Sequence, residues 1–228
     1  MKHFKNFKTC VYCTAQTLAS LDETTLARDY AYLEKYVGID KVYLETYRDG
    51  TWVAIDHMKM IQNFFKKHGV EIAGGITTVT PPLEKDDVKR QRLFQTFCYS
   101  NEAMRTYLKK IVTYTAELFD EIILDDFFFT SCTCDDCLRE RSNLSWAEFR
   151  SKKMIDVAEN LVLKPAKLAN PSVKVTIKYP NWRESYHETG YVPKIQPSMF
   201  DKIYTGTETR NTAHTDQHLP RYLSYSIM

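Results

Sequence analysis

Two adjacent carboxylates stand at the end of a short apolar run near the middle of the chain. Asp125 and Asp126 follow the apolar residues 122–124, and three phenylalanines at 127–129 come next. Acids beside apolar surface are partly desolvated, which raises their pKa or requires a partner charge. Carboxylates in such a setting can act as nucleophile, base or acid, and a pair of them cleaves glycosidic bonds. Asp125 and Asp126 are therefore the first candidates for catalytic residues.

The apolar run before these acids has the composition of a strand that is covered on both faces. Alternate side chains of a strand share a face, so Asp125 points the same way as Ile123, whereas Asp126 points to the other side. Only one of the two acids can therefore face the site directly.

Glycoside hydrolysis requires a second carboxyl group on the other side of the scissile bond. Glu208, in the segment YTGTETR, is the candidate general acid, and Arg210 beside it could hold a carboxylate or a substrate oxygen. Glu45, in the segment YLETYRDG, is the reserve candidate. A single acid at such a position is more often a helix cap or a surface ion pair, so each assignment depends on the geometry.

Side chains suited to binding a sugar accompany these acids. A sugar ring has apolar faces and a polar rim, so an aromatic face beside hydrogen-bonding groups fits it. The candidate substrate-binding residues follow three of the expected strands and are Glu45, Tyr47, Arg48, Lys178, Asn181, Trp182 and Arg210. Trp182 is as well suited to packing in a core as to stacking on a substrate.

The candidate residues follow a regular alternation of expected strands and helices. Apolar runs predict strands at residues 7–13, 41–47, 70–79, 119–126, 173–179 and 201–207. Amphipathic stretches predict helices at residues 24–37, 56–68, 101–118 and 146–163, and one more from residue 218. Asn101 and Ser145 are expected helix N-caps, and Pro165 is expected to end or kink the helix before it.

This alternation predicts an α/β fold, either a (β/α)8 TIM-barrel type or an open doubly wound sheet. No glycine-rich phosphate-binding sequence follows a strand, which weakens the doubly wound alternative. Polar residues at several successive strand ends favour the barrel. Eight strand–helix units usually need ~250 residues, and this chain places about six strands in 228 residues. We predict a single partial TIM-barrel catalytic domain over residues 1–228, truncated after about six strands, whose open edges favour a homo-oligomer.

Three closely spaced cysteines follow the acid pair and suggest a metal site. Cys132, Cys134 and Cys137 supply three thiolates, and a tetrahedral zinc site needs four ligands. Cys13, at the end of the first expected strand, is the predicted fourth ligand, and Cys10 is the other option. A site closed by four thiolates has no open position for chemistry, so such a zinc would be structural. The alternative is free thiols, or a disulfide, in an exposed loop.

Composition and charge exclude several classes of protein. A hydrophobic content of 43% indicates a globular chain, and a net charge of +2 without a basic stripe argues against nucleic-acid binding. No apolar run is long enough for a membrane span, and no signal peptide is evident. We expect a cytoplasmic protein, or a secreted one if a leader has been removed. Cys98 is expected to be a buried thiol, and the histidines show no paired pattern for a catalytic metal.

The segment EIILDDFFF resembles the DGIHLDDYFY-type segment of the glycosyl-hydrolase-like barrels of carbohydrate-degrading bacteria. The spacing from Asp120 to Asp125 is also similar to the fourth-strand pattern of several retaining glycosidase families, in which the second acid is the nucleophile. The resemblance implies a glycoside hydrolase in which Asp125 faces the barrel mouth as nucleophile or base. Asp126 would orient Asp125 or bind a sugar hydroxyl, and the substrate would be an oligosaccharide or a glycoside.

The cysteine loop and the WAEFR segment at residues 146–150 resemble the corresponding part of the β-galactosidases of glycoside hydrolase family 42. Those enzymes carry Asn-Glu where this chain has Asp125 and Asp126. Their assignment of the acid therefore does not transfer to this chain.

Three alternatives remain open at the level of the sequence. A non-catalytic carbohydrate-binding barrel would show the same aromatic and polar strand ends without a working acid pair. A truncated barrel could be an inactive fragment of a glycosidase. A barrel aldolase or isomerase would use a Schiff-base lysine, for which Lys178 is correctly placed at a strand end.

Overall fold

The structure, a computed structural model, describes residues 4–79, 92–180 and 186–205 of the chain. Its centre is a sheet in which six strands run parallel in the order β1-β2-β4-β5-β6-β7. These strands span Cys10–Cys13 (β1), Lys41–Arg48 (β2), Glu71–Ile76 (β4), Glu121–Leu124 (β5), Lys174–Tyr179 (β6) and Lys202–Thr205 (β7). A two-residue strand, Thr51–Trp52 (β3), pairs antiparallel with the end of β2.

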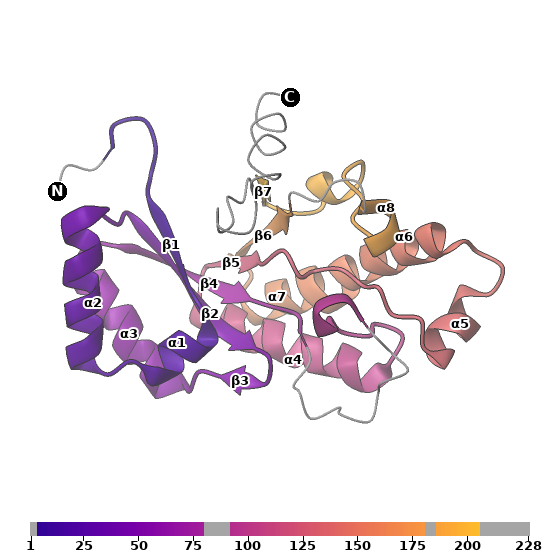
Figure 1. Cartoon of the computed structure of the whole chain (residues 1–228), viewed down its shortest axis with the longest axis horizontal. Coiled ribbons are helices and arrows are strands. Elements are labelled where there is room, and N and C mark those ends of the chain that lie inside the picture. The colour runs from indigo at the N-terminus through magenta and orange to yellow at the C-terminus, as the bar shows by residue number, and fades with distance from the viewer. Residues whose placement is uncertain (1–3, 80–91, 181–185, 206–228) are drawn as a thin grey trace, which may run out of the picture.

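Helices connect the parallel strands and lie beside the sheet (Figure 1). The α-helices span Ala15–Ser20 (α1), Glu23–Tyr36 (α2), Ile55–Lys67 (α3), Glu102–Leu118 (α4), Asp135–Arg141 (α5), Trp146–Val157 (α6), Lys164–Ala169 (α7) and Tyr186–Thr189 (α8). Short 3₁₀ turns occur at Leu93–Gln95 (η1) and Gln196–Ser198 (η4), and a π-helical segment at Ala158–Leu163 (η2) joins α6 to α7. Every helix within the described residues is too short or too polar to cross a lipid bilayer.

The sheet is curved, as a barrel wall must be. Tyr43 of β2 and Tyr204 of β7 are separated by three intervening strands, yet their hydroxyl oxygens are 2.9 Å apart. Below them, Glu121 of β5 accepts hydrogen bonds from Lys41 at 2.6 Å and from Lys202 at 2.7 Å. These contacts cross the concave face, so the six parallel strands form a half-barrel, and the predicted TIM-barrel type of fold is confirmed.

Side-chain alternation along the strands separates the two faces of this wall. Leu44 and Leu124 belong to the apolar cores between the sheet and the helices. Their neighbours Tyr43 and Ile123 pack with Ala73 on the concave face instead. Residues two places further along each strand from this inner cluster should therefore point toward the barrel mouth.

Local sequence signals set several helix ends as expected. Asn101 caps α4 by accepting from the Met104 N–H at 3.1 Å, and Ser145 forms a capping box with Glu148 at the start of α6.

Pro165 was expected to end or kink the helix before it, and the structure shows that the helical path does not end there. The chain widens into the π-helical segment η2, and Pro165 lies in the first turn of α7, where a missing N–H is tolerated. The proline therefore changes the helical register without ending the helical path.

Gly74 is required where β4 approaches helix α4. A Cβ atom at this position would lie 2.7 Å from Cγ2 of Thr115 and 2.8 Å from the ring of Phe119, both of which are buried. We expect Gly74→Ala to lower the free energy of unfolding by about 1–3 kcal/mol, because the helix must move off the sheet. Urea unfolding measures this change. Thr115→Ser removes the nearer methyl group and should restore part of the loss in the double variant, and an unchanged unfolding midpoint for Gly74→Ala would contradict the expectation.

Candidate active site

The acid pair lies directly after β5, next to two cations. Asp125 is only 9% exposed, and one of its oxygens lies 3.0 Å from Nη2 of Arg48 while the other lies 3.1 Å from Nζ of Lys178. Asp126 is buried as well, with Oδ2 at 3.6 Å from the same lysine. The desolvated acids therefore have the partner charges that their apolar setting requires.

The backbone fixes which acid faces the concave side. The Asp125 N–H donates to the carbonyl of Ile76 at 3.0 Å, which continues the ladder between β4 and β5 by one residue. The Asp125 side chain thus continues the inward direction of Ile123. The carbonyl of Asp126 accepts from the hydroxyl of Tyr191 at 2.9 Å, which holds the next turn of the chain in place.

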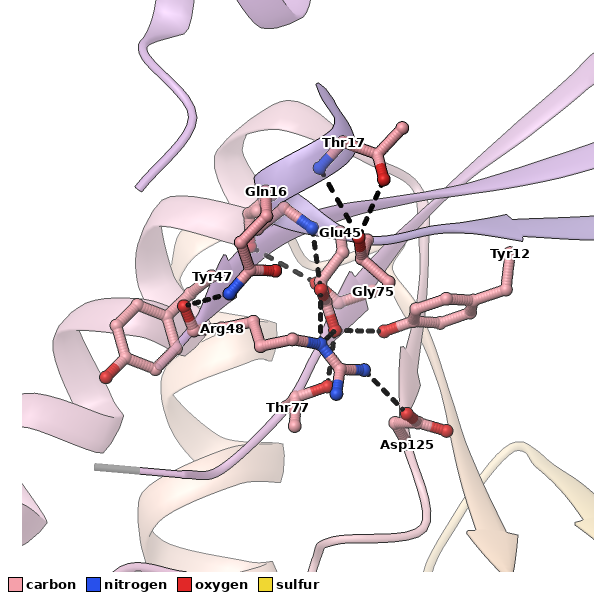
Figure 2. A network of polar contacts seen from close by, with 12 residues as sticks. Tyr12, Gln16, Thr17, Glu45, Tyr47, Arg48, Gly75, Thr77 and Asp125 are labelled. Carbon is pink, nitrogen blue, oxygen red and sulfur yellow. Dashed lines mark hydrogen bonds and ion pairs between the residues drawn. The ribbon is translucent and has the colours of Figure 1, made fainter. Parts of the chain in front are cut away.

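Glu45, at the C-terminal end of β2, has no exposed surface and is surrounded by donors (Figure 2). Oε1 accepts from the Tyr12 hydroxyl at 2.7 Å and from the Thr77 hydroxyl. Oε2 accepts from the Ala15 N–H at 2.7 Å and from Nε of Arg48 at 2.9 Å. Glu45 therefore holds the ends of several neighbouring elements together, and its predicted roles as reserve acid and substrate-binding residue stay predictions.

Arg48 joins the two buried carboxylates. Its Nε binds Glu45, and its Nη2 points to Asp125 (Figure 2). Burial would lower the pKa of Arg48, but the hydrogen bond and charge of Glu45 outweigh it and raise that pKa. Burial and the charges of Glu45 and Asp125 hold the pKa of Tyr12 well above its usual value, so its hydroxyl remains a donor. The guanidinium is therefore a fixed positive charge between two acids.

Four buried cysteines form a second polar cluster beyond the acid pair. The sulfur atoms of Cys98, Cys132, Cys134 and Cys137 all lie within 4.8 Å of one another. Cys98 Sγ is 3.6 Å from the sulfur atoms of both Cys134 and Cys137. This arrangement could hold a metal ion.

The fourth thiol of this cluster is Cys98, which replaces the predicted Cys13 and its alternative Cys10. Cys98 follows β4, the neighbour of β5, whereas β1 lies two strands further away in the sheet. Cys10 is exposed, and among the described residues the group of close sulfur atoms contains neither Cys10 nor Cys13.

Cationic side chains flank the four-cysteine cluster. Arg141 and Arg150 lie over the Trp146 ring, with their Cζ atoms 4.7 Å and 4.8 Å from its centre. Arg150 also donates to the carbonyl of Ser131 at 3.0 Å and so ties the cysteine loop to α6. Four thiolates around a divalent ion would carry two negative charges, and these guanidinium groups would help to compensate them.

Comparison with known proteins places the chain in a family. A family model described as "Probable glycosyl hydrolase, catalytic domain" matches residues 1–228. The chain belongs to this glycosyl hydrolase family. An uncharacterized protein of Saccharolobus solfataricus, SSO3021, is 33% identical over 230 residues, which cover 90% of this chain and 38% of that protein.

Solved structures show the fold of this glycosyl hydrolase domain. A β-galactosidase from Rahnella sp. R3 matches 98% of the chain with a TM-score of 0.67 at 12% identity. α-L-Fucosidase isoenzyme 2 from Paenibacillus thiaminolyticus matches 87% of it with a TM-score of 0.56, also at 12% identity. The chain spans 42% and 40% of these two enzymes, so it corresponds to a part of each.

Tyr47 was predicted to bind substrate, and the structure shows a different position. A bulge between Glu45 and Tyr47 interrupts the alternation of β2, so the two side chains leave on opposite faces. Tyr47 is fully buried in the core beside Trp52 and Phe97, and its hydroxyl donates to the carbonyl of Val79 at 3.0 Å. It supports the wall of the glycosyl hydrolase domain and does not line the site.

Several predicted and unpredicted residues complete the description of the site. Lys178 lies near the C-terminal end of β6 and contacts both acids of the pair, and its predicted role in substrate binding stays a prediction. The predicted residues Asn181, Trp182, Glu208 and Arg210 lie outside the described residues, and their roles stay predictions.

Tyr12 and Thr77 were not predicted. The rule of polar residues at strand ends could have identified Thr77, whereas only the fold brings Tyr12 to Glu45.

Glu45→Gln tests the importance of this buried carboxylate. The substitution removes the charge next to Arg48 and turns one acceptor into a donor that faces other donors. We expect the free energy of unfolding to fall by about 3 kcal/mol, measured by urea unfolding. Glu71→Gln is a matched control at the exposed start of β4, where Glu71 pairs with the exposed Lys8, and it should change stability by at most about 1 kcal/mol. Equal effects of the two substitutions would contradict a special role of Glu45.

Proposed function

We propose that this domain hydrolyses a glycosidic bond in an oligosaccharide or glycoside by carboxylate catalysis, with Asp125 as nucleophile or base. The observation that carries the proposal is the position of Asp125 on the concave side of a half-barrel, at the C-terminal end of β5, between Arg48 and Lys178. Barrel enzymes have their catalytic groups at this end of the strands. Membership in the glycosyl hydrolase family supports the reaction class.

The paired state of Asp125 is compatible with this role. Each carboxylate oxygen offers two lone pairs, and the two cations each approach a different oxygen. Lone pairs therefore remain for attack on an anomeric carbon or for activation of a water molecule. The cations also fix the orientation of the carboxylate, which reduces the entropy cost of reaching the reactive geometry.

The remaining parts of the proposed machinery come from neighbouring strand ends. Glu208, which follows β7 in the sequence, is the proposed general acid, and Asp126 and Lys178 would bind sugar hydroxyls. Asn181, Trp182 and Arg210 are proposed to contact the substrate. A separation of about 5–5.5 Å between the Asp125 and Glu208 carboxyl groups would indicate a retaining mechanism, and about 6.5–9.5 Å an inverting one.

A non-catalytic carbohydrate-binding barrel is the second candidate. It is favoured by the engagement of both Asp125 oxygens with cations, because such ion pairs also serve purely structural roles. The two candidates differ in turnover, which a single substitution can separate.

Asp125→Asn keeps the shape of the side chain but removes its charge. We expect the rate of hydrolysis to fall at least about 10³-fold for a glycoside that the wild type cleaves, with binding of the same saccharide largely retained. A panel of 4-nitrophenyl glycosides identifies the substrate, and calorimetric titration measures binding. Asp120→Asn, at the other end of β5, is the matched control and should keep its activity. Saccharide binding without turnover by the wild type would favour the binding barrel.

We also propose that the four-cysteine cluster holds a structural zinc ion. Four thiolates suit tetrahedral zinc and leave no open position. Cys98 follows β4, Cys132 and Cys134 lie in the loop that begins with the acid pair after β5, and Cys137 lies in the first turn of α5, which follows that loop. A metal ion at this point would therefore fasten two neighbouring loops at the C-terminal end of the sheet.

Cys98→Ser and Cys13→Ser form a matched pair of variants for the metal site. The purified wild type should contain one zinc ion per chain by mass spectrometry of the metal, and Cys98→Ser should lose it with a fall in Tm of several degrees. Cys13→Ser should retain the zinc, because Cys13 lies outside the cluster. A wild type without zinc after expression in zinc-supplemented medium would overturn the proposal.

A further inference from the structure

An exposed aromatic residue on the loop after β4 packs against the phenylalanines that follow the proposed catalytic acid. Phe94, in the η1 turn after β4, is 51% exposed. Its ring meets the rings of Phe127 and Phe129 edge to face, at centroid distances of 5.3 Å and 6.4 Å. Both partners belong to the triple phenylalanine that follows the acid pair. Phe129 is buried and Phe127 is half-buried, so Phe94 and Phe127 form an aromatic surface that joins the loop after β4 to the loop after β5.

A chain of contacts connects this aromatic surface with Asp125. The Arg48 guanidinium lies 5.7 Å from the centre of the Phe127 ring, and its Nη2 binds Asp125 at 3.0 Å. Phe127 thus stands between Arg48 and the more exposed Phe94. The aromatic surface is thus linked to the proposed reacting carboxylate through Phe127 and Arg48.

The backbone holds Phe94 in an unfavourable conformation. Its φ and ψ angles are 53° and 22°, and the next residue, Gln95, also has a positive φ of 54°. The left-handed region is rare for a bulky residue such as phenylalanine, and strain of this kind concentrates at ligand-binding positions. Asparagine would suit the conformation better. The presence of phenylalanine therefore calls for a role of its ring.

The strained turn is anchored on both sides. The Leu93 N–H donates to the Ser131 hydroxyl at 2.7 Å, and the Phe97 N–H donates to the carbonyl of Thr78 at 3.1 Å. These hydrogen bonds fix the turn against the strand end and the loop after β5. A ring presented on a fixed turn loses little conformational entropy when it meets a ligand.

We propose that Phe94, together with Phe127, forms an aromatic subsite for the sugar unit on the leaving-group side of the scissile bond. The apolar face of a pyranose ring packs on an aromatic ring, and Arg48 with the acid pair supplies the polar partners for its rim. The substrate is then an oligosaccharide, or a glycoside with a ring-shaped leaving group, in preference to a glycoside with a small leaving group. This inference rests on the proposed hydrolysis at Asp125 and adds the substrate class.

Phe94→Asn tests the subsite, because asparagine adopts the left-handed conformation and removes the ring. A glycosyl fluoride has only fluoride as its leaving group and therefore does not occupy the subsite. Its rate of hydrolysis by the variant should stay within twofold of the wild-type rate. For the matching di- and trisaccharides, KM should rise roughly three- to tenfold. Phe94→Trp should restore the low KM. Tyr32→Asn, at an exposed aromatic residue on α2, is the control and should change neither value.

Stability and binding measurements distinguish the other outcomes. If Phe94 were only structural, Phe94→Asn would lower Tm and affect both substrates alike, which would overturn the subsite. If Phe94→Asn cleaves the fluoride normally and its KM for the oligosaccharides is unchanged, the subsite is overturned but the proposed hydrolysis at Asp125 is not. Calorimetric titration of Asp125→Asn with the same oligosaccharides measures the subsite without turnover. If the titrations of Asp125→Asn show no binding and the wild type cleaves neither the oligosaccharides nor the fluoride, both the proposed hydrolysis and the subsite are overturned.

Discussion

A carboxylate with no exposed surface lies at the C-terminal end of β2, and the candidate site is arranged around it. Burial of the Glu45 charge would be costly if it were not matched by hydrogen bonds and an opposite charge. Its four donors come from β1, from the first turn of α1, from the end of β2 and from the residue after β4. The need to satisfy Glu45 thus holds three neighbouring strand ends and a helix in one arrangement, and it positions Arg48 for Asp125.

The same constraint explains why the inner surface of the sheet contains small residues next to large ones. Gly75 lies opposite Glu45 in the strand register, and a Cβ atom there would be 2.6 Å from the Tyr12 hydroxyl. The glycine leaves the space through which Tyr12 reaches Glu45. A residue without a side chain is in this way part of the support of the acid pair.

The ion pairs at the two ends of the half-barrel have different roles. At the N-terminal end, Lys41 and Lys202 surround Glu121 and link distant strands, which stabilises the curvature. At the C-terminal end, the charges of Arg48 and Lys178 converge on Asp125 beside the loops after β4 and β5. The phenylalanine surface and three of the four clustered cysteines belong to those two loops, and the fourth, Cys137, lies in the first turn of α5. The loops that would shape a substrate site are thus fastened to each other as well as to the sheet.

The sequence by itself determined the local features of this protein. Apolar periodicity predicted the positions of the six parallel strands, and capping residues predicted the starts of α4 and α6, because these signals act over a few residues. The acid pair after β5 and the three clustered cysteines could be identified for the same reason. Tertiary structure alone decided which distant groups meet. Cys98 completes the cluster because β4 lies beside β5, Tyr47 turns into the core because of a bulge, and Glu45 is enclosed because strand register brings Tyr12 and Thr77 to it. Strand order, register and bulges depend on contacts between residues far apart in the chain, which no local pattern records.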